Sequence, residues 1–265
     1  MSQPSNINSL FQAAQAENLV TAAGAAVVLN IPDMGAAIQA GLGVKVDDVQ
    51  ASEVLLVTFL VDDSGSICSA GNEGVVRDGV NLVLEALKKS KQRDSILVSC
   101  LGLNRGTIYP YALLDNVPNL DTNNYRADGG TPLYDMSAVV LGQVLAKTQE
   151  FSDAGVPTKT VTVIVTDGAD VHSTIHRSPD AVAPLVKDLR RQENHIIAAM
   201  GIADGSTDFT SVFTRMGIDP RWILLPSNTQ SEIRKAFALV SQSAVRASQA
   251  VAAFSRVAAG GFGTP

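Results

Sequence analysis

One uninterrupted apolar run constrains the fold more than any other feature of the chain. Residues 54 to 61 carry a single polar side chain, Thr58, and the run leads directly into Asp62-Asp63-Ser64-Gly65-Ser66. A short, unbroken run rich in Val and Leu is typical of a strand that is buried on both faces of a parallel sheet. Ligands of such sheets bind beyond the carboxyl ends of the strands. The functional chemistry is therefore expected to begin at Asp62.

The loop after this run offers oxygen atoms at alternate positions, from Asp62, Ser64 and Ser66. Hard cations such as Mg²⁺ prefer oxygen ligands. Taken alone, the pattern is ambiguous, because Asp-Ser-Gly also forms ordinary turns. Two later stretches add to it. Residues 129 to 135, Gly-Gly-Thr-Pro-Leu-Tyr-Asp, read as a loop that leads into a helix, and residues 160 to 168 read as a second buried strand that ends in a carboxylate.

These three stretches, in this order and context, resemble the von Willebrand factor A (vWA) domain over roughly residues 51 to 240. The resemblance implies a doubly wound α/β fold, with a mainly parallel six-stranded sheet, one antiparallel edge strand and helices on both faces. It also implies an intact metal-ion-dependent adhesion site, assigned to Asp62, Ser64, Ser66, Thr131 and Asp167. The compact chain looks like the stand-alone bacterial type of vWA protein.

The remaining pattern of the chain agrees with alternating strands and helices. Strands are predicted over 94–103, 107–114, 195–202 and 221–225, and helices over 73–90, 132–150, 179–193 and 206–216. Pro110 confines the second of these strands to a sheet edge, and its short link to the preceding strand predicts an antiparallel pair.

The residue types explain how such a site would work. Ser64, Ser66 and Thr131 would bind Mg²⁺ or Mn²⁺ through neutral hydroxyls, while Asp62 and Asp167 would hold the ion directly or through water. Few direct anionic ligands leave residual positive charge, so an open position would attract an Asp or Glu of another protein. Asp62 is expected in a surface crevice, and Asp63 is expected to point away because successive side chains alternate at a strand end.

The sequence therefore favours a metal-dependent protein-binding module that is not an enzyme. One alternative is a structural subunit of a larger assembly, and another is a metal-dependent hydrolase with Asp63 or Asp170 as its base. A phosphoacceptor of the haloacid dehalogenase type would need Asp-x-Asp, whereas this chain has Asp-x-Ser. His172 and His176 have the spacing of a zinc pair on a helix, but they lack the Glu of His-Glu-x-x-His, and Ser178-Pro179 indicates a loop.

Composition sets limits on the partners. A net charge of −6 and a pI of about 5.0 argue against a nucleic-acid partner. The N-terminus lacks the basic start of a secretory signal, and no run reaches the roughly 18 apolar residues of a membrane span, so a cytoplasmic protein without a membrane partner is expected. The resemblance implies a protein partner such as an AAA+ ATPase or a stress-response protein.

Two extensions flank the predicted domain, over residues 1–50 and 241–265. The first is expected to pack on the domain, with a helix over 9–21, a short strand or helix end over 25–30 and a half-exposed strand over 44–49. The last predicted helix runs from 231 to 259 and carries a heptad stripe of Ile233, Phe237, Val240, Ala244, Ala247, Val251, Phe254 and Ala258. Its second half is expected either to fold back on the acidic N-terminal extension or to dock on a neighbouring copy as a homo-oligomer contact.

Overall fold

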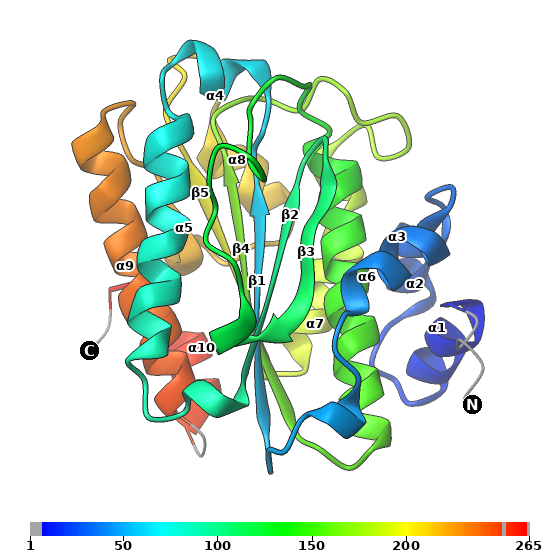
Figure 1. Ribbon diagram of the computed structural model, residues 1–265. Coiled ribbons are helices and arrows are strands. Elements are labelled where there is room, and N and C mark those ends of the chain that lie inside the picture. Colours follow the sequence, from blue (N-terminus) through cyan, green and yellow to red (C-terminus); the bar gives the residue numbers. More distant parts are fainter. Residues whose placement is uncertain (1–6, 251–252, 264–265) are drawn as a thin grey trace.

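The computed structural model describes residues 7–250 and 253–263, and a six-stranded sheet organises it (Figure 1). The strand order is β3-β2-β1-β4-β5-β6. At its centre, β1 (Val54–Val61) is buried along its whole length and pairs in parallel with β2 (Ile96–Gly102) and β4 (Thr158–Thr166). The parallel arrangement continues through β5 (His195–Gly201) to the short β6 (Ile223–Leu224). The predicted α/β fold is therefore confirmed.

The antiparallel edge strand is also confirmed. β3 (Gly106–Leu113) runs antiparallel to β2, and the register of the pair shifts where Pro110 lies, between Tyr109 and Ala112. Pro110 is exposed and cannot donate a hydrogen bond to a ladder. An edge strand with an irregular register is where a sheet tolerates such a residue.

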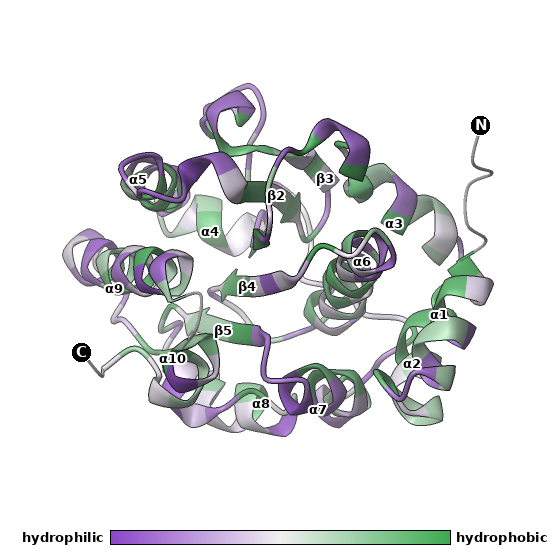
Figure 2. Ribbon diagram, turned by 90° about the horizontal axis from the view of Figure 1, so that it is seen from below, coloured by the Kyte–Doolittle hydropathy of each residue, from purple (hydrophilic) through white to green (hydrophobic). Residues whose placement is uncertain are grey.

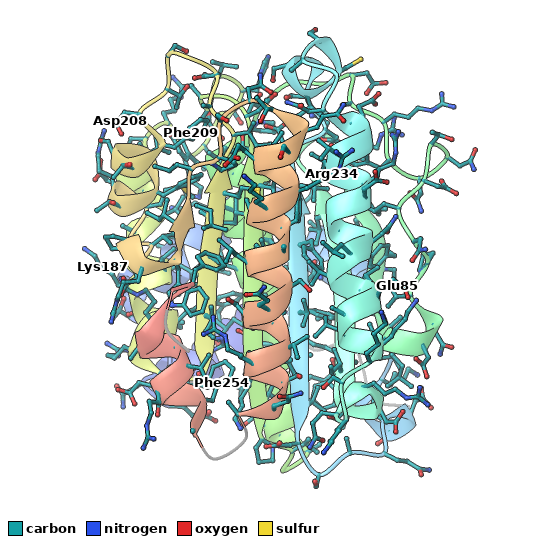
Figure 3. All side chains as sticks on the ribbon, turned by 90° about the vertical axis from the view of Figure 1, so that its left-hand side faces the viewer. Glu85, Lys187, Asp208, Phe209, Arg234 and Phe254 are labelled. Atoms are coloured by element: carbon teal, nitrogen blue, oxygen red, sulfur yellow. The ribbon has the colours of Figure 1, made fainter. Side chains whose placement is uncertain are left out.

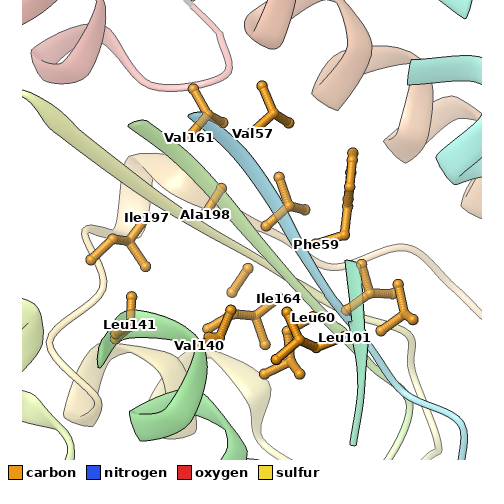
Figure 4. Packing of buried hydrophobic residues seen from close by; sticks show 14 of the residues in the cluster. Val57, Phe59, Leu60, Leu101, Val140, Leu141, Val161, Ile164, Ile197 and Ala198 are labelled. Carbon is orange, nitrogen blue, oxygen red and sulfur yellow. The ribbon is translucent and has the colours of Figure 1, made fainter. Parts of the chain in front are cut away.

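Helices cover both faces of the sheet (Figures 1 and 2). On one face lie α5 (Glu73–Lys88) and α9 (Gln230–Gln249), and on the other lie α6 (Leu133–Asp153) and α7 (Ala183–Arg191). Two shorter helices, α4 (Gly65–Ser69) and α8 (Phe209–Arg215), follow strand ends. Between these layers, apolar side chains of the central strands and of α6 form the core, among them Leu60, Val140 and Ile164 (Figure 4).

The N-terminal arm, residues 7–50, packs beside α6 and α7 as three helices (Figure 1): α1 (Ile7–Ala16), α2 (Ala22–Leu29) and α3 (Met34–Leu42). The segment that was ambiguous between a strand and a helix end is a helix. It starts where the buried Asp188 carboxylate of α7 accepts hydrogen bonds from the backbone and the hydroxyl of Thr21, at 2.7 and 2.8 Å. Close approach to α7 therefore decides the conformation of an Ala/Val segment that fits either structure.

The end of the arm departs from the prediction. The expected strand over 44–49 is a single 3₁₀ turn, Val46–Asp48, and Val44 donates one backbone hydrogen bond of 2.8 Å to Tyr111 of β3. Two buried side chains of α6 hold this region. Gln143 donates to the carbonyl of Gly41 at 3.1 Å, and Lys147 donates to the carbonyl of Val44. Specific contacts to α6 thus replace strand pairing.

No single helix in the described part of the chain is long and apolar enough to cross a membrane. The pair Ala22–Leu29 and Met34–Asp48 reaches the required length and composition only jointly, across a bend of 91°.

The C-terminal segment is two helices rather than one. α9 ends at Gln249, and α10 (Phe254–Gly260) lies beside it, so that α9 lies between α10 and α5 (Figure 3). The indole nitrogen of Trp222 donates to the carbonyl of Ala258 at 2.8 Å, and the Trp222 ring meets Phe262 edge to face with centroids 4.9 Å apart. The tail therefore folds back on its own chain. Besides the segment around Trp222, it contacts Arg246 of α9, which donates to the carbonyl of Phe262 at 3.3 Å, and Lys159 of β4, whose Nζ lies 5.8 Å from the Phe254 ring centroid. None of these partners belongs to the N-terminal arm.

The heptad stripe on α9 packs against other parts of the same chain. Its members on α9 are all buried, and they include Ile233, Phe237, Val240, Ala244 and Ala247. Phe237 lies so close to α5 that a Cβ at Gly79 would come within 2.1 Å of its ring. Of the rest, Phe254 is buried and Val251 lies outside the described residues. Of the two alternatives for the second half of the stripe, contact with another copy does not hold for Ala244 and Ala247, because both are buried within the chain.

Candidate metal centre

The five predicted ligands come together at the carboxyl edge of the sheet. Asp62 and Asp167 follow β1 and β4, which are parallel neighbours, and the backbone of Asp62 donates to Val165 at 2.9 Å. Parallel neighbours end at the same edge, so two residues that are distant in sequence meet there. The loop that carries Thr131 is attached to the loop after β1 through a backbone hydrogen bond of 2.9 Å from Gly65 to the carbonyl of Gly129.

A chain of short hydrogen bonds connects the side-chain oxygens. The hydroxyl oxygens of Ser64 and Ser66 are 2.8 Å apart, and Ser66 donates to Oδ1 of Asp167 at 2.6 Å. The hydroxyl of Thr131 faces the same place, because a Cβ on Gly168 would lie 3.7 Å from Oγ of Ser66 and 3.9 Å from Oγ1 of Thr131. We call Asp62, Ser64, Ser66, Thr131 and Asp167 the oxygen cluster.

The sequence predicted that Asp62 lies in a surface crevice, and this prediction is wrong, because Asp62 is fully buried. Its Oδ1 accepts from the backbone of Ser64 at 2.8 Å, and its Oδ2 accepts from the hydroxyl of Thr166 at 2.6 Å. Burial raises the pKa of Asp62, while the hydrogen bonds from Ser64 and Thr166 oppose that change. Asp62 therefore fixes the shape of the loop and would act on a bound ion chiefly by orienting Ser64.

Asp167 is also buried but more loosely held. Burial raises its pKa to about 6, the hydrogen bond from Ser66 opposes the shift, and the negative charges of Asp62 and Asp204 add to it. In the described part of the chain, neither Asp62 nor Asp167 has a basic side chain within ion-pair distance. Two buried carboxylates without a cation beside three hydroxyls fit a small divalent cation such as Mg²⁺ or Mn²⁺.

Asp63 points away from the oxygen cluster, as expected. Its Oδ1 accepts from the backbone and the side chain of Asn104, at 2.7 and 2.9 Å, and its Oδ2 accepts from the backbone of Arg105 at 3.1 Å. Asn104 in turn exchanges hydrogen bonds with the backbone of Gly130, at 2.6 and 2.8 Å. Asp63 thereby ties the loop after β2 to the loop that carries Thr131.

His172 has a role that the sequence did not reveal. Its Nδ1 accepts from the backbone of Thr131 at 2.9 Å, and its ring covers Gly130, where a Cβ would meet Nδ1 at 2.4 Å. His176 contacts a different part of the chain, because its Nε2 lies 2.8 Å from the carbonyl of Val27. The two histidines have the sequence spacing of a zinc pair, but their side chains bind different parts of the chain, His172 at Thr131 and His176 at Val27.

The structure contains no cluster of three or more His, Cys, Asp or Glu residues arranged to hold a metal within its described residues. The oxygen cluster is of another kind, because it combines two carboxylates with three hydroxyls. The only further carboxylate proposed from the sequence near it, Asp170, accepts hydrogen bonds from the backbone of Tyr134 at 2.8 Å and from the hydroxyl of Ser173 at 2.5 Å. Asp170 therefore anchors its loop to the start of α6.

No protein-family model and no curated protein matches the chain. Among solved structures, it is similar to the pilus adhesin SpaC from Lactobacillus rhamnosus GG in its open conformation, with a TM-score of 0.54 and 15% identity over 74% of this chain and 30% of the SpaC chain. A von Willebrand factor type A structure from Catenulispora acidiphila gives 0.47 and 16% over 74% and 43%, and manganese-loaded Plasmodium vivax TRAP gives 0.44 and 18% over 71% and 74%.

The strand order and the helices on both faces define a doubly wound α/β fold, which the chain shares with the SpaC structure. The chain spans less than a third of the SpaC chain, and the similarity to SpaC concerns the fold alone.

Proposed function

We propose that this chain is a metal-dependent protein-binding module. One Mg²⁺ or Mn²⁺ binds at the oxygen cluster, and an Asp or Glu of a partner protein completes its coordination. The observation that carries the proposal is the hydrogen-bonded series from Ser64 through Ser66 to Asp167, beside a second buried carboxylate and with no basic partner among the described residues.

Each residue has a separate part in this proposal. Ser64, Ser66 and Thr131 supply neutral oxygens, Asp167 supplies negative charge, and Asp62 orients the loop that carries the serines. Ser66 is exposed while Asp62 is fully buried, so an ion at the serine side of the cluster is accessible to a partner. When bound, the cation supplies a positive charge that attracts a carboxylate.

We also propose that the chain has no intrinsic hydrolase activity. A general base must be free to reach a metal-bound water. The two carboxylates that were candidates for this role, Asp63 and Asp170, are occupied by hydrogen bonds to Asn104, Arg105, Tyr134 and Ser173. Their geometry supports a positioning role for both.

The oxygen cluster supports a protein partner that offers a carboxylate. The more specific identity of that partner comes only from the family resemblance. An AAA+ ATPase or a stress-response protein that offers an exposed acidic residue, in the cytoplasm of a bacterium, remains our prediction. The alternative of a structural subunit that assembles through the C-terminal helix has less support, because the stripe residues of α9 from Ile233 to Ala247 are buried within the chain.

A pull-down of cell proteins in Mg²⁺ and in EDTA tests the proposal. We expect a partner that is retained in Mg²⁺, released by EDTA and lost in Asp167→Asn. Asp94→Asn is the matched control, because Asp94 lies ahead of β2, at the other edge of the sheet, with its side chain 85% exposed. A partner that is retained equally in EDTA, or equally by Asp167→Asn, would contradict the proposal.

A further inference from the structure

An open pocket of about 390 Å³ lies at the same edge of the sheet as the oxygen cluster. It lies between the loop that follows β5 and the end of β6. Apolar surface is contributed by Ala203, Phe209 and Leu225, and the polar rim comes from residues 205–208 and Thr210. We call it the Leu225 pocket. Leu225 is 51% exposed, which makes it one of the most exposed large apolar side chains among the described residues.

The pocket is built on well-packed elements. The ring of Phe209 lies against the end of β5, where a Cβ on Gly201 would come within 2.3 Å of it, and it stacks on Phe213 with centroids 5.7 Å apart. The two walls are joined by a backbone hydrogen bond of 3.0 Å from Ala203 to Pro226. The exposure of Leu225 is therefore a feature of a defined cavity and not of a loose loop.

The Leu225 pocket is one strand away from the oxygen cluster. β4, which ends at Asp167, and β5, which leads into the pocket, are parallel neighbours, and Ile202 donates to the carbonyl of Thr166 at 2.9 Å. Asp204, whose chain neighbours Ala203 and Gly205 line the pocket, is close enough to act electrostatically on Asp167. A single extended segment of a partner can therefore span both places.

The charges around the cluster differ between its two sides. On the pocket side, Asp204 accepts four hydrogen bonds from Ser206 and Thr207, which outweigh the opposing effect of its partial burial and lower its pKa to about 2. On the opposite side, two carboxylates of the chain itself balance the charge of Arg105, because its Nη2 lies 3.5 Å from Oδ2 of Asp128 and its Nε lies 4.0 Å from Oδ2 of Asp63. A second acidic residue next to the metal-binding carboxylate is thus repelled on the pocket side by the charge of Asp204.

We propose that the Leu225 pocket receives an apolar side chain, such as Leu, Ile, Met or Phe, from the same partner segment whose Asp or Glu binds the metal. This inference rests on the proposed function and adds a sequence preference to it. The partner segment has an apolar residue, and no second acidic residue, on the side of β5. Apolar burial next to the metal contact then contributes both affinity and orientation.

The test uses a phage-displayed library of random peptides, panned on the whole chain in Mg²⁺ and eluted with EDTA. We expect the eluted peptides to share an Asp or Glu with an apolar residue a few positions away. At saturating Mg²⁺, Leu225→Ser should weaken these peptides about tenfold, because an apolar contact is lost, and Leu225→Met should restore most of the affinity. Leu82→Ser is the matched control, since Leu82 is 44% exposed on α5, outside the pocket.

A peptide in which the apolar residue is changed to Ser should lose the same affinity as the Leu225→Ser variant, and the two changes together should cost little more. Eluted peptides without an apolar preference, or peptides that bind Leu225→Ser at full strength, would overturn the pocket while leaving the proposed metal-dependent binding intact. A library from which EDTA elutes nothing would overturn both the pocket and the proposed function.

Discussion

The hydroxyl of Ser66 donates to Oδ1 of Asp167 at 2.6 Å, although the two residues are 101 positions apart in sequence. This hydrogen bond joins the loop after β1 to the end of β4. It also places the neutral hydroxyl oxygen of Ser66 next to a carboxylate oxygen of Asp167 within the oxygen cluster. Both are ligand types that Mg²⁺ and Mn²⁺ accept, so the pair is the most direct place to test metal binding.

Replacing Asp167 by Asn keeps the size of the side chain and removes its charge. We expect the affinity for Mg²⁺ and Mn²⁺ to fall by more than about tenfold, because the cluster then has one carboxylate instead of two. Isothermal titration calorimetry measures the effect directly. Asp94→Asn, at the other edge of the sheet, should bind the ions as the unchanged chain does, and an unchanged affinity in Asp167→Asn would remove Asp167 from the site.

Replacing Asp62 by Ala should affect folding as well as metal binding. The change leaves the buried backbone N–H of Ser64 without an acceptor and leaves the hydroxyl of Thr166 with only the carbonyl of Gly168 at 3.2 Å, which costs about 1–3 kcal/mol of unfolding free energy. Asp167→Ala should cost less, because it removes only one hydrogen bond, from the exposed Ser66. Urea denaturation in EDTA compares the two. Equal losses would show that Asp62 does not hold the loop.

The central features of the fold were readable from the sequence because they depend on local patterns. An apolar run that ends in Asp62 and another that ends in Asp167 each predict a buried strand with a carboxylate at its end. Parallel pairing then brings the two ends together without further information. The position of Pro110 was sufficient for the edge strand in the same way.

The features that the sequence did not reveal depend on contacts between distant segments. Nothing local marks His172 as the acceptor for Thr131, and the helical pattern up to residue 259 shows no Gly or Pro at the end of α9. That end is explained by the docking of α10 on Trp222. The Leu225 pocket likewise forms where two loops meet, and the pattern of apolar residues in the sequence does not predict that contact.

The buried His195 should make stability depend on pH. Burial lowers its pKa to about 3, so between pH 6.5 and 3 the unfolded chain takes up a proton that the folded chain does not. The stability that this histidine contributes is complete above pH 6.5 and declines as the pH falls, by up to about 1.4 kcal/mol per pH unit. In His195→Asn, urea denaturation between pH 6.5 and 4 should show a correspondingly smaller loss. Equal pH slopes for the two proteins would contradict this account.

Two glycines of α5 should respond in opposite directions to replacement by Ala. In a helix, Ala is favoured over Gly by about 1 kcal/mol, and around Gly74 a new Cβ would meet no atom within 4 Å, so Gly74→Ala should stabilise the protein by up to that amount. At Gly79 the new Cβ would come within 2.1 Å of the Phe237 ring of α9. Separating the two packed helices costs about 1–3 kcal/mol, which exceeds the gain in helix propensity, so Gly79→Ala should destabilise the protein. Thermal unfolding followed by circular dichroism distinguishes the two variants. If Gly79→Ala raised the melting temperature as Gly74→Ala does, α9 would not pack on α5 as closely as the structure shows.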